Sequence, residues 1–112
     1  MKVKSEHDIQ NEIRAAVSQY AVIFRINVGT GRTENGNYFT TGVPPGFSDL
    51  FGFRLNDGKA VFIEVKTPKG KISEKQRHFL TQMKKNGAIA GVVRSPEEAI
   101  KLILEDKDYG IY

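Results

Sequence analysis

One stretch decides the fold prediction: Ala60-Val61-Phe62-Ile63-Glu64-Val65-Lys66. Its apolar first half predicts a buried strand, and Glu64 and Lys66 come at the end of that strand. Because residues two apart in a strand point to the same side, these two charged side chains should emerge together. Earlier in the chain, Asp49 begins a second apolar run, and Asn56-Asp57-Gly58 separates the two runs. The sequence therefore predicts a β-hairpin with charged side chains gathered near one end.

The register of this hairpin decides whether its charged side chains meet. A two-residue turn at Asp57-Gly58 would pair Asp49 with Lys66. Asp49 and Glu64 would then be diagonal neighbours, about 7–8 Å apart at the backbone, and all three side chains would share one face. A three-residue loop would pair Asp49 with Val65 and direct the acid to the other face, unless a bulge restored the alternation. The register is therefore a test of the predicted site.

The remaining pattern predicts one α/β domain over residues 1–112. Ser5, Ser73 and Ser95 each stand at the N-cap of a helical pattern, and the latter two open capping boxes. Strands are expected at residues 21–28, 49–55, 59–66 and 88–94. The long polar segment 29–46 has room for a short hairpin around Asn35-Gly36. The order α-β-β-β-α-β-α predicts a mixed β-sheet flanked by helices.

Composition excludes several classes of protein. The chain has no cysteine, so disulfide scaffolds, thiolate zinc sites and cysteine nucleophiles are ruled out. The first residues lack the apolar core of a secretion signal, and no long uncharged apolar run follows. We therefore expect a cytoplasmic protein that has no membrane partner.

Positive charge is concentrated directly after the predicted hairpin. Residues 66–85 contain seven basic residues and one acidic residue, for a net charge of +6, whereas the whole chain carries +4. A solvated helix face is the ordinary explanation of such a run. Its position beside Asp49 and Glu64 favours a polyanionic ligand instead.

The predicted hairpin end has the chemistry of a site for a hard cation. Two carboxylates without nitrogen ligands suit Mg²⁺ or Mn²⁺, with water and substrate oxygens completing the shell. The carbonyl of Val65, between the two charged side chains, is a candidate third ligand. Lys66 could orient a water molecule or neutralise developing negative charge. The alternative is that Glu64 and Lys66 form a solvent-facing strand pair without a ligand.

Two polar residues interrupt the apolar stripes of the predicted helices. Gln76 lies among the apolar positions of the second helix, and Glu6 extends the stripe of the first helix by one turn. Burying such groups is costly unless they meet partners, and a shared polar site would supply them. The alternatives are a capping box for Gln76 and helix-dipole stabilisation for Glu6.

These residues, taken in order, resemble the VRR-NUC domain, the virus-type replication-repair nuclease branch of the PD-(D/E)XK superfamily. The resemblance rests on residues 42–50, GVPPGFSDL, and residues 62–76, FIEVKTPKGKISEKQ, and extends over nearly the whole chain. One departure is Ser48, where the family motif usually has proline before the aspartate. This difference changes the stiffness of the chain at that point and leaves the ligands intact.

The resemblance implies a restriction-endonuclease-like fold and metal-dependent hydrolysis of phosphodiester bonds. It implies that Asp49, Glu64 and the Val65 carbonyl bind Mg²⁺ or Mn²⁺ and that Lys66 is catalytic. By position, Glu6 and Gln76 match accessory site residues of the family. No small-molecule cofactor is expected. The candidate DNA contacts are Arg32, Lys69, Lys71, Lys75 and Arg77.

Stand-alone members of this length resemble phage-type proteins and Holliday-junction resolvases, which implies a homodimer in a bacterial or phage-infected cell. A four-way junction needs two matched incisions, and a two-fold dimer presents two sites. The hypothesis is thus a dimeric, structure-selective DNA endonuclease. The alternatives are a flap, replication-fork or less selective nuclease of the same chemistry, a non-catalytic nucleic-acid-binding module, and a structural protein with a charged hairpin.

Overall fold

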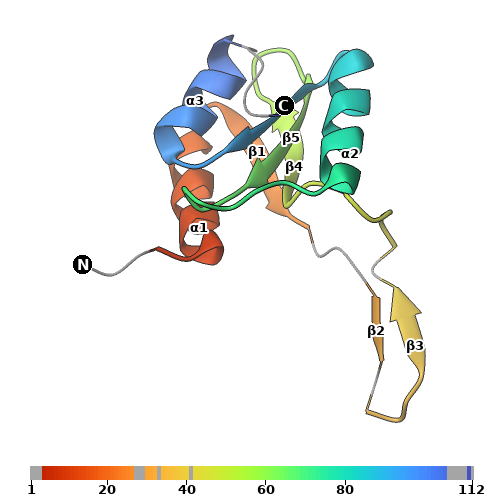
Figure 1. Cartoon of the computed structure of the whole chain (residues 1–112). Coiled ribbons are helices and arrows are strands. Elements are labelled where there is room, and N and C mark those ends of the chain that lie inside the picture. The colour runs from red at the N-terminus through yellow and green to blue at the C-terminus, as the bar shows by residue number, and fades with distance from the viewer. Residues whose placement is uncertain (1–3, 27–29, 33, 41, 106–110, 112) are drawn as a thin grey trace.

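The computed structural model describes residues 4–26, 30–32, 34–40, 42–105 and 111. Three helices and six strands follow one another in these residues. Figure 1 shows how they are arranged. They are α1 (Glu6–Val17), β1 (Ala21–Arg25), β2 (Thr30–Arg32), β3 (Tyr38–Thr40), β4 (Leu50–Arg54), β5 (Ala60–Val65), α2 (Glu74–Lys85), β6 (Ile89–Val93) and α3 (Pro96–Glu105). With β2 and β3 set apart as a separate hairpin, the predicted order α-β-β-β-α-β-α is confirmed.

Serine caps begin the helices where the sequence predicts them. Ser5 and Ser73 each accept from the N–H three residues later, and both form complete capping boxes. At α3 the prediction is only half right. Ser95 Oγ accepts from the Glu98 N–H at 3.2 Å, but the Glu98 carboxylate accepts from the N–H of Arg94 at 2.6 Å and so holds the end of β6.

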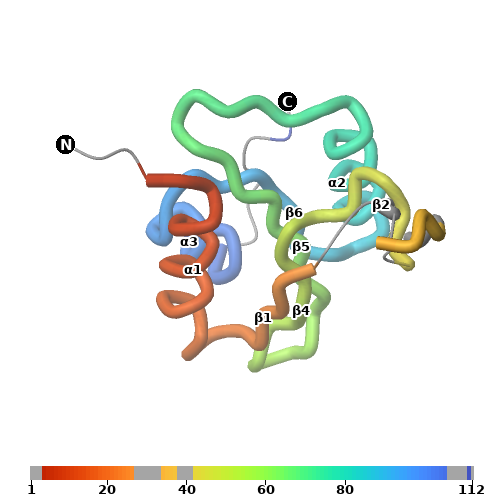
Figure 2. The backbone as a smooth tube through the Cα atoms, turned by 90° about the horizontal axis from the view of Figure 1, so that it is seen from below, coloured from red at the N-terminus to blue at the C-terminus, as the bar shows by residue number. Residues whose placement is uncertain are grey.

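The main sheet is mixed, with the strand order β1-β4-β5-β6. The β1–β4 and β4–β5 pairs are antiparallel, whereas β5 and β6 are parallel and joined through α2. Figure 2 shows α1 and α3 on one side of the sheet and α2 on the other. In this three-layer arrangement, each side chain of β5 faces either α1 and α3 or α2.

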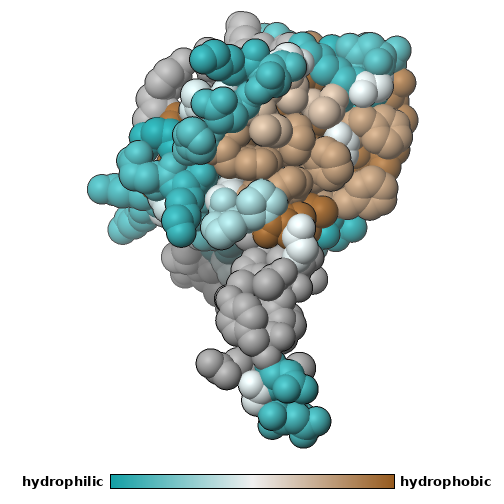
Figure 3. Space-filling model, turned by 90° about the vertical axis from the view of Figure 1, so that its right-hand side faces the viewer, coloured by the Kyte–Doolittle hydropathy of each residue, from teal (hydrophilic) through white to brown (hydrophobic). Residues whose placement is uncertain are grey.

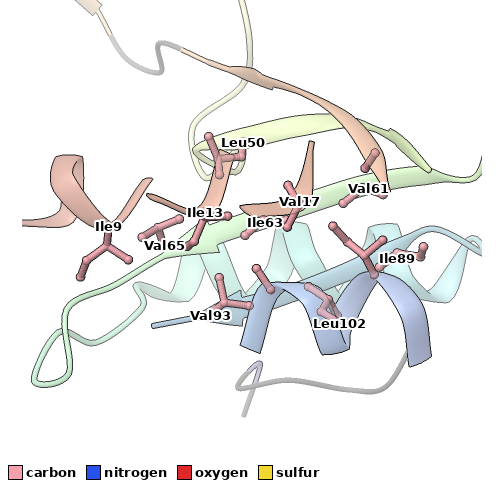
Figure 4. Packing of buried hydrophobic residues seen from close by; sticks show 13 residues of the cluster. Ile9, Ile13, Val17, Leu50, Val61, Ile63, Val65, Ile89, Val93 and Leu102 are labelled. Atoms are coloured by element: carbon pink, nitrogen blue, oxygen red, sulfur yellow. The ribbon is translucent and has the colours of Figure 1, made fainter. Parts of the chain in front are cut away.

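The alternation along β5 divides the core into two parts. Val61, Ile63 and Val65 pack against α1 and α3, as Figure 4 shows, whereas Phe62 packs in an aromatic cluster on the α2 side. Burying a side chain of this size contributes about 1.5–3 kcal/mol. Because Glu64 shares the face of Phe62, it lies on the side of the sheet that α2 covers.

The register of the β4–β5 hairpin differs from the predicted one by two residues. Leu50 pairs with Ile63, so the register continues to Asp49 opposite Glu64. The prediction that Asp49 lies opposite Lys66 is therefore wrong. Since the shift is an even number of residues, the three charged side chains still belong to one face.

The connection between β4 and β5 explains this register. The predicted two-residue turn does not form, because residues 55–58 make a wider turn. The Gly58 N–H donates to Arg54 O at 2.8 Å, and the Arg54 N–H donates to Lys59 O at 2.8 Å. The Arg54 guanidinium also holds the Asp57 carboxylate through two bonds of 3.1 and 2.6 Å. Asp57 thus stabilises the wider turn with its side chain.

A separate antiparallel hairpin of β2 and β3 projects from the body of the molecule in Figure 1. The prediction of a hairpin around Asn35-Gly36 is confirmed, and Gly36 has the positive φ of 82° that such turns require. Residues 27–28, predicted as the end of the first strand, lie outside the described residues. Within the described residues, no helix has the length and hydropathy needed to cross a membrane.

Candidate active site

Asp49 and Glu64 face each other across the open end of the β4–β5 hairpin. The Asp49 Oδ2 accepts a hydrogen bond from the N–H of Val65 at 2.9 Å. The carboxylate thus takes the place of a main-chain carbonyl in the hydrogen bonding between β4 and β5. The Asp49 carbonyl accepts from the N–H of Ile26 at 2.8 Å, beyond the end of β1. Bonds to both neighbouring strands therefore fix the position of Asp49.

The segment before Asp49 is packed tightly onto α2. Gly46 has φ of 90°, and a Cβ atom there would lie 2.5 Å from the carbonyl oxygen of Lys75, so only glycine fits. Ser48 is fully buried, and its Oγ donates to Leu50 O at 2.9 Å. This hydrogen bond restrains the chain just before Asp49, at the position where a proline ring would otherwise do so.

Glu64 is a buried carboxyl group that interacts with Gln76 and Asp49 and has one oxygen without a hydrogen-bond donor from the described residues. The residue is 1% exposed, and its Oε1 accepts from Gln76 Nε2 at 3.3 Å. Its Oε2 is buried and has no hydrogen-bond partner among the described residues. Burial, followed by the charge of Asp49, raises the pKa of Glu64 to about 9, and Lys66 acts in the opposite direction. The group is thus suited to an additional positive charge.

Gln76 combines the two roles that the sequence left as alternatives. Its Oε1 accepts from the N–H of Ser73 at 2.8 Å in the capping box, and its Nε2 donates to Glu64. The first turn of α2 and the end of β5 are therefore connected by one amide group. The structure brings Gln76 and Glu64 together as the sequence predicts.

Lys66 directly follows β5, on the face that Glu64 occupies. Its N–H donates to Val93 O at 3.1 Å, and its side chain is half-buried. The Lys66 charge lowers the pKa of Glu64, which indicates proximity of the two groups. Val65 contributes its N–H to Asp49, whereas its side chain packs in the core on the other face. The role of the Val65 carbonyl as a ligand stays a prediction.

Glu6 approaches the same region from the first turn of α1. It is half-buried, and its charge is among the causes of the raised pKa of Glu64, although the smallest of those named. One turn further, Gln10 is buried, and its Oε1 has no hydrogen-bond partner among the described residues. Gln10 is not among the site residues predicted from the sequence. Its spacing of four residues from Glu6 could have revealed it.

The donor set fits a divalent cation held by few protein ligands. No cluster of three or more His, Cys, Asp or Glu side chains suited to a metal occurs in the described residues. Two carboxylates nevertheless face each other, and the buried Oε2 of Glu64 is free to accept a ligand. Mg²⁺ is commonly bound in this way, through one or two carboxylates, with water and substrate oxygens as its other ligands.

The basic residues predicted to contact DNA differ in their exposure to solvent. Lys69, Lys71 and Lys75 are exposed, so their charges are available to a ligand. Arg77 is half-buried, and its Nε lies 3.9 Å from the Oε1 of the exposed Glu74, a weak interaction. Arg32 is part of β2, but its side chain lies outside the described part of the structure.

An apolar groove adjoins Lys75. It has a volume of about 510 Å³, and its lining includes Pro44, Pro45, Lys75, Phe79 and Met83. Figure 3 looks onto the side of the molecule that carries α2 and shows an apolar area bordered by hydrophilic residues above and on the left. The surface beside the predicted site therefore combines positive charge with apolar contact area.

Comparison with known proteins agrees with this arrangement. The family model of the VRR-NUC domain matches residues 6–97, which include all the predicted site residues. The chain belongs to the VRR-NUC family. A solved structure described as a VRR_NUC domain is similar to it over 88% of this chain and 92% of that chain, with 23% identity and a TM-score of 0.62. At that identity the likeness shows a shared VRR-NUC fold. No curated protein matches the sequence.

Membership of the VRR-NUC family implies a nuclease of the PD-(D/E)XK type, with DNA as its partner. Nuclease domains of this type generally use divalent metal ions. The facing Asp49 and Glu64 and the neighbouring Lys66 occupy the positions to which the sequence resemblance assigns these functions. The VRR-NUC fold and the predicted family are therefore confirmed.

Proposed function

We propose that this VRR-NUC protein is a divalent-metal-dependent DNA endonuclease with Asp49, Glu64 and Lys66 at its reaction centre. One observation carries the proposal: the Oε2 of the buried Glu64, which has no hydrogen-bond partner among the described residues, lies on the face that Asp49 and Lys66 share. A buried carboxyl group without a ligand destabilises the fold. A purely structural hairpin would gain nothing from keeping such a group.

In this proposal, Asp49, Glu64 and the Val65 carbonyl hold Mg²⁺ or Mn²⁺. When bound, such an ion lowers the pKa of a water molecule and stabilises charge on the phosphate. The contribution of the protein is positional. Gln76 fixes the orientation of the Glu64 carboxyl through its cap-bound amide. Val65 does the same for Asp49 through its N–H.

Lys66 provides a positive charge beside the two carboxylates. The ammonium group would orient the attacking water or neutralise the developing charge on the scissile phosphate. Glu6 is an accessory acid at the edge of the site. Lys69, Lys71 and Lys75, with Arg32 and Arg77, would bind the phosphate backbone on either side of the cut.

We further propose a homodimer that cuts four-way junctions in the cytoplasm of a bacterial or phage-infected cell. One domain of this size offers one reaction centre, and two matched incisions require two centres related by symmetry. The extended hairpin of β2 and β3 projects from the body and is therefore available to contact a second subunit or a DNA branch.

Cleavage of defined DNA substrates tests the proposal. Four-way junctions, flaps, forks, linear duplexes and single strands are incubated with the native protein in Mg²⁺, Mn²⁺ or EDTA. The same assay is run on Lys66→Ala and on Lys101→Ala, an exposed lysine of α3 that serves as the charge-matched control. Native and Lys101→Ala proteins should cleave only with metal, and Lys66→Ala should lose at least about 100-fold in rate.

Equal activity of native protein and Lys66→Ala would remove the proposed mechanism. Cleavage of flaps or forks with intact four-way junctions would overturn the junction part alone, and a monomer by light scattering would overturn the dimer. DNA affinity should also fall steeply with salt. Replacing Lys69, Lys71 and Lys75 together by alanine should reduce the slope of log K against log salt by about 3.

A further inference from the structure

Arg94 lies next to Lys66 at the carboxyl ends of two parallel strands. Val65 pairs with Val93, and the Lys66 N–H donates to Val93 O at 3.1 Å, so the two chains continue side by side. Ala90 and Val92 pack on the α2 side of the sheet. By strand alternation, Arg94 follows them onto the face that Lys66 and Glu64 occupy.

The Arg94 guanidinium is bound to the turn that follows Lys66. Its Nη1 donates to the carbonyl of Thr67 and, at 2.7 Å, to the carbonyl of Gly70. The Gly70 N–H donates to Thr67 O at 3.0 Å and closes this turn. A half-buried arginine usually binds a carboxylate or a phosphate, whereas here both bonds go to neutral main-chain oxygens of one short segment. The position of the turn therefore depends on Arg94.

This turn lies against the aliphatic part of the Lys66 side chain. A Cβ atom added to Gly70 would lie 3.4 Å from the Lys66 Cδ and 3.2 Å from the Thr67 Oγ1. The glycine thus brings its backbone into contact with the lysine stem. A lysine side chain in water samples many rotamers, and contact along its stem restricts them.

We propose that Arg94 is a positioning residue that holds the turn of residues 67–70 over Lys66 and so confines the Lys66 ammonium group to the reaction centre. Arg94 is itself anchored, because its N–H donates to the Glu98 carboxylate at 2.6 Å. The chain of contacts runs from α3 through Arg94 and the turn to Lys66. Both bonds come from Nη1, whose two hydrogens have fixed directions in the planar guanidinium group.

This inference rests on the proposed function of Lys66, so its test needs a measurement that does not require cleavage. Arg94→Met removes the hydrogen-bond donors and keeps most of the stem. Gly70→Ala keeps Arg94 and places a methyl group 3.2 Å from the Thr67 Oγ1, which must shift by a few tenths of an ångström and so disturbs the turn over Lys66. Arg14→Met removes an exposed arginine of α1 and serves as the charge-matched control.

The first measurement is NMR of the protein labelled with ¹³C at the lysine Cε positions. The Lys66 signal is identified by its loss in Lys66→Arg. We expect an ordered Lys66 Cε in native protein and Arg14→Met, and a more mobile or displaced one in Arg94→Met and Gly70→Ala. An unchanged Lys66 signal in both variants would overturn the inference, whether or not the protein cleaves DNA.

The second measurement separates kcat from KM. Misplacing a catalytic group by about 1 Å can cost about 100-fold in rate. We therefore expect kcat to fall about 10- to 100-fold in Arg94→Met and Gly70→Ala, with KM within about twofold of native. A rise in KM with unchanged kcat would make Arg94 a DNA-binding residue and would overturn the inference.

A double-mutant cycle shows whether Arg94 acts through Lys66. In Lys66→Ala, the additional change Arg94→Met should alter the residual rate by less than about twofold. Additive losses would overturn the inference. If Arg94→Met does not fold in a thermal melt, Gly70→Ala provides the same comparison. A native protein without metal-dependent cleavage but with an ordered Lys66 that Arg94→Met mobilises would overturn the proposed function and leave the positioning role of Arg94.

Discussion

The Nε2 of Gln76 donates a hydrogen bond to the Oε1 of Glu64 across 3.3 Å, and the Oε1 of the same amide accepts from Ser73. Because the amide oxygen is engaged in the helix cap, its nitrogen must face the carboxyl group. The beginning of α2 therefore determines how the buried acid at the end of β5 is oriented.

Replacing Gln76 should affect both stability and activity, whereas replacing its capping partner should affect stability alone. Gln76→Ala removes the reciprocal cap bond and leaves Glu64 without its donor. Ser73→Ala removes the cap oxygen but keeps the amide next to Glu64. We expect a loss of about 1 kcal/mol in unfolding free energy for each variant. Cleavage, assayed well below melting, should fall at least about 10-fold only for Gln76→Ala. Equal activity of both variants would contradict a role of Gln76 in the site.

Glu64→Gln should stabilise the metal-free protein. The native carboxyl has a pKa raised to about 9 and an oxygen without a partner, whereas an amide is neutral at every pH. We expect a gain of about 1–2 kcal/mol in EDTA at pH 7, visible as a melting temperature higher by several degrees. Mn²⁺ should raise the melting temperature of native protein and leave that of Glu64→Gln unchanged. Glu97→Gln, an exposed change on α3, is the control. A less stable Glu64→Gln in EDTA would refute the prediction.

The turn between β4 and β5 should weaken in acid. The hydrogen bond from Arg54 and then the N–H of Lys59 lower the pKa of Asp57 from 3.8 to about 2. A carboxylate with a lowered pKa stabilises the fold fully above its ordinary pKa, and this contribution is lost as pH falls toward 2. Asp57→Asn should thus be less stable than native protein at pH 6, and urea unfolding should show the difference shrinking between pH 4 and 2. A constant difference over that range would exclude this linkage.

Gly46→Ala should be far more harmful than another alanine replacement at a glycine with positive φ. Gly46 and Gly87 have φ of 90° and 98°, but a Cβ at Gly46 would collide with the Lys75 backbone and one at Gly87 would meet nothing within 4 Å. We expect about 1 kcal/mol of destabilisation for Gly87→Ala and at least about 2 kcal/mol more for Gly46→Ala, measured by urea unfolding. Similar losses would show that the contact of this segment with α2 is not tight.

The fold is largely predictable from this sequence because its signals are local. Ser5 and Ser73 begin helices through contacts with residues three positions away, and strand alternation depends on neighbours alone. The predicted register of β4 and β5 is wrong because the turn between them is set by side-chain hydrogen bonds of Arg54, one set local and one bond to a distant helix. That side chain holds Asp57 and also donates to the carbonyl of Ile103 at 2.7 Å, in a helix far along the chain.

The candidate site also combines residues that can be predicted from the sequence with residues that only the structure reveals. Asp49, Glu64, Lys66 and Gln76 could be selected because acidic, basic and amide side chains interrupt apolar patterns at a spacing that the fold brings together. Arg94 could not, because an arginine at a strand end is ordinary in sequence, and Gln10 is marked only by its spacing of four residues from Glu6. The burial of Gln10 and the main-chain partners of the Arg94 guanidinium become visible only in three dimensions.

The short distance along the chain between Asp49 and Gln76 has a consequence for assembly. Four of the five predicted catalytic residues, all except Glu6, come from one hairpin and the helix that follows it, so little chain entropy is lost in bringing them together. Contacts between near neighbours in sequence also form early in folding. A newly made chain could therefore gather its reaction centre before α3 is in place, and only the addition of β6 and Arg94 would complete it.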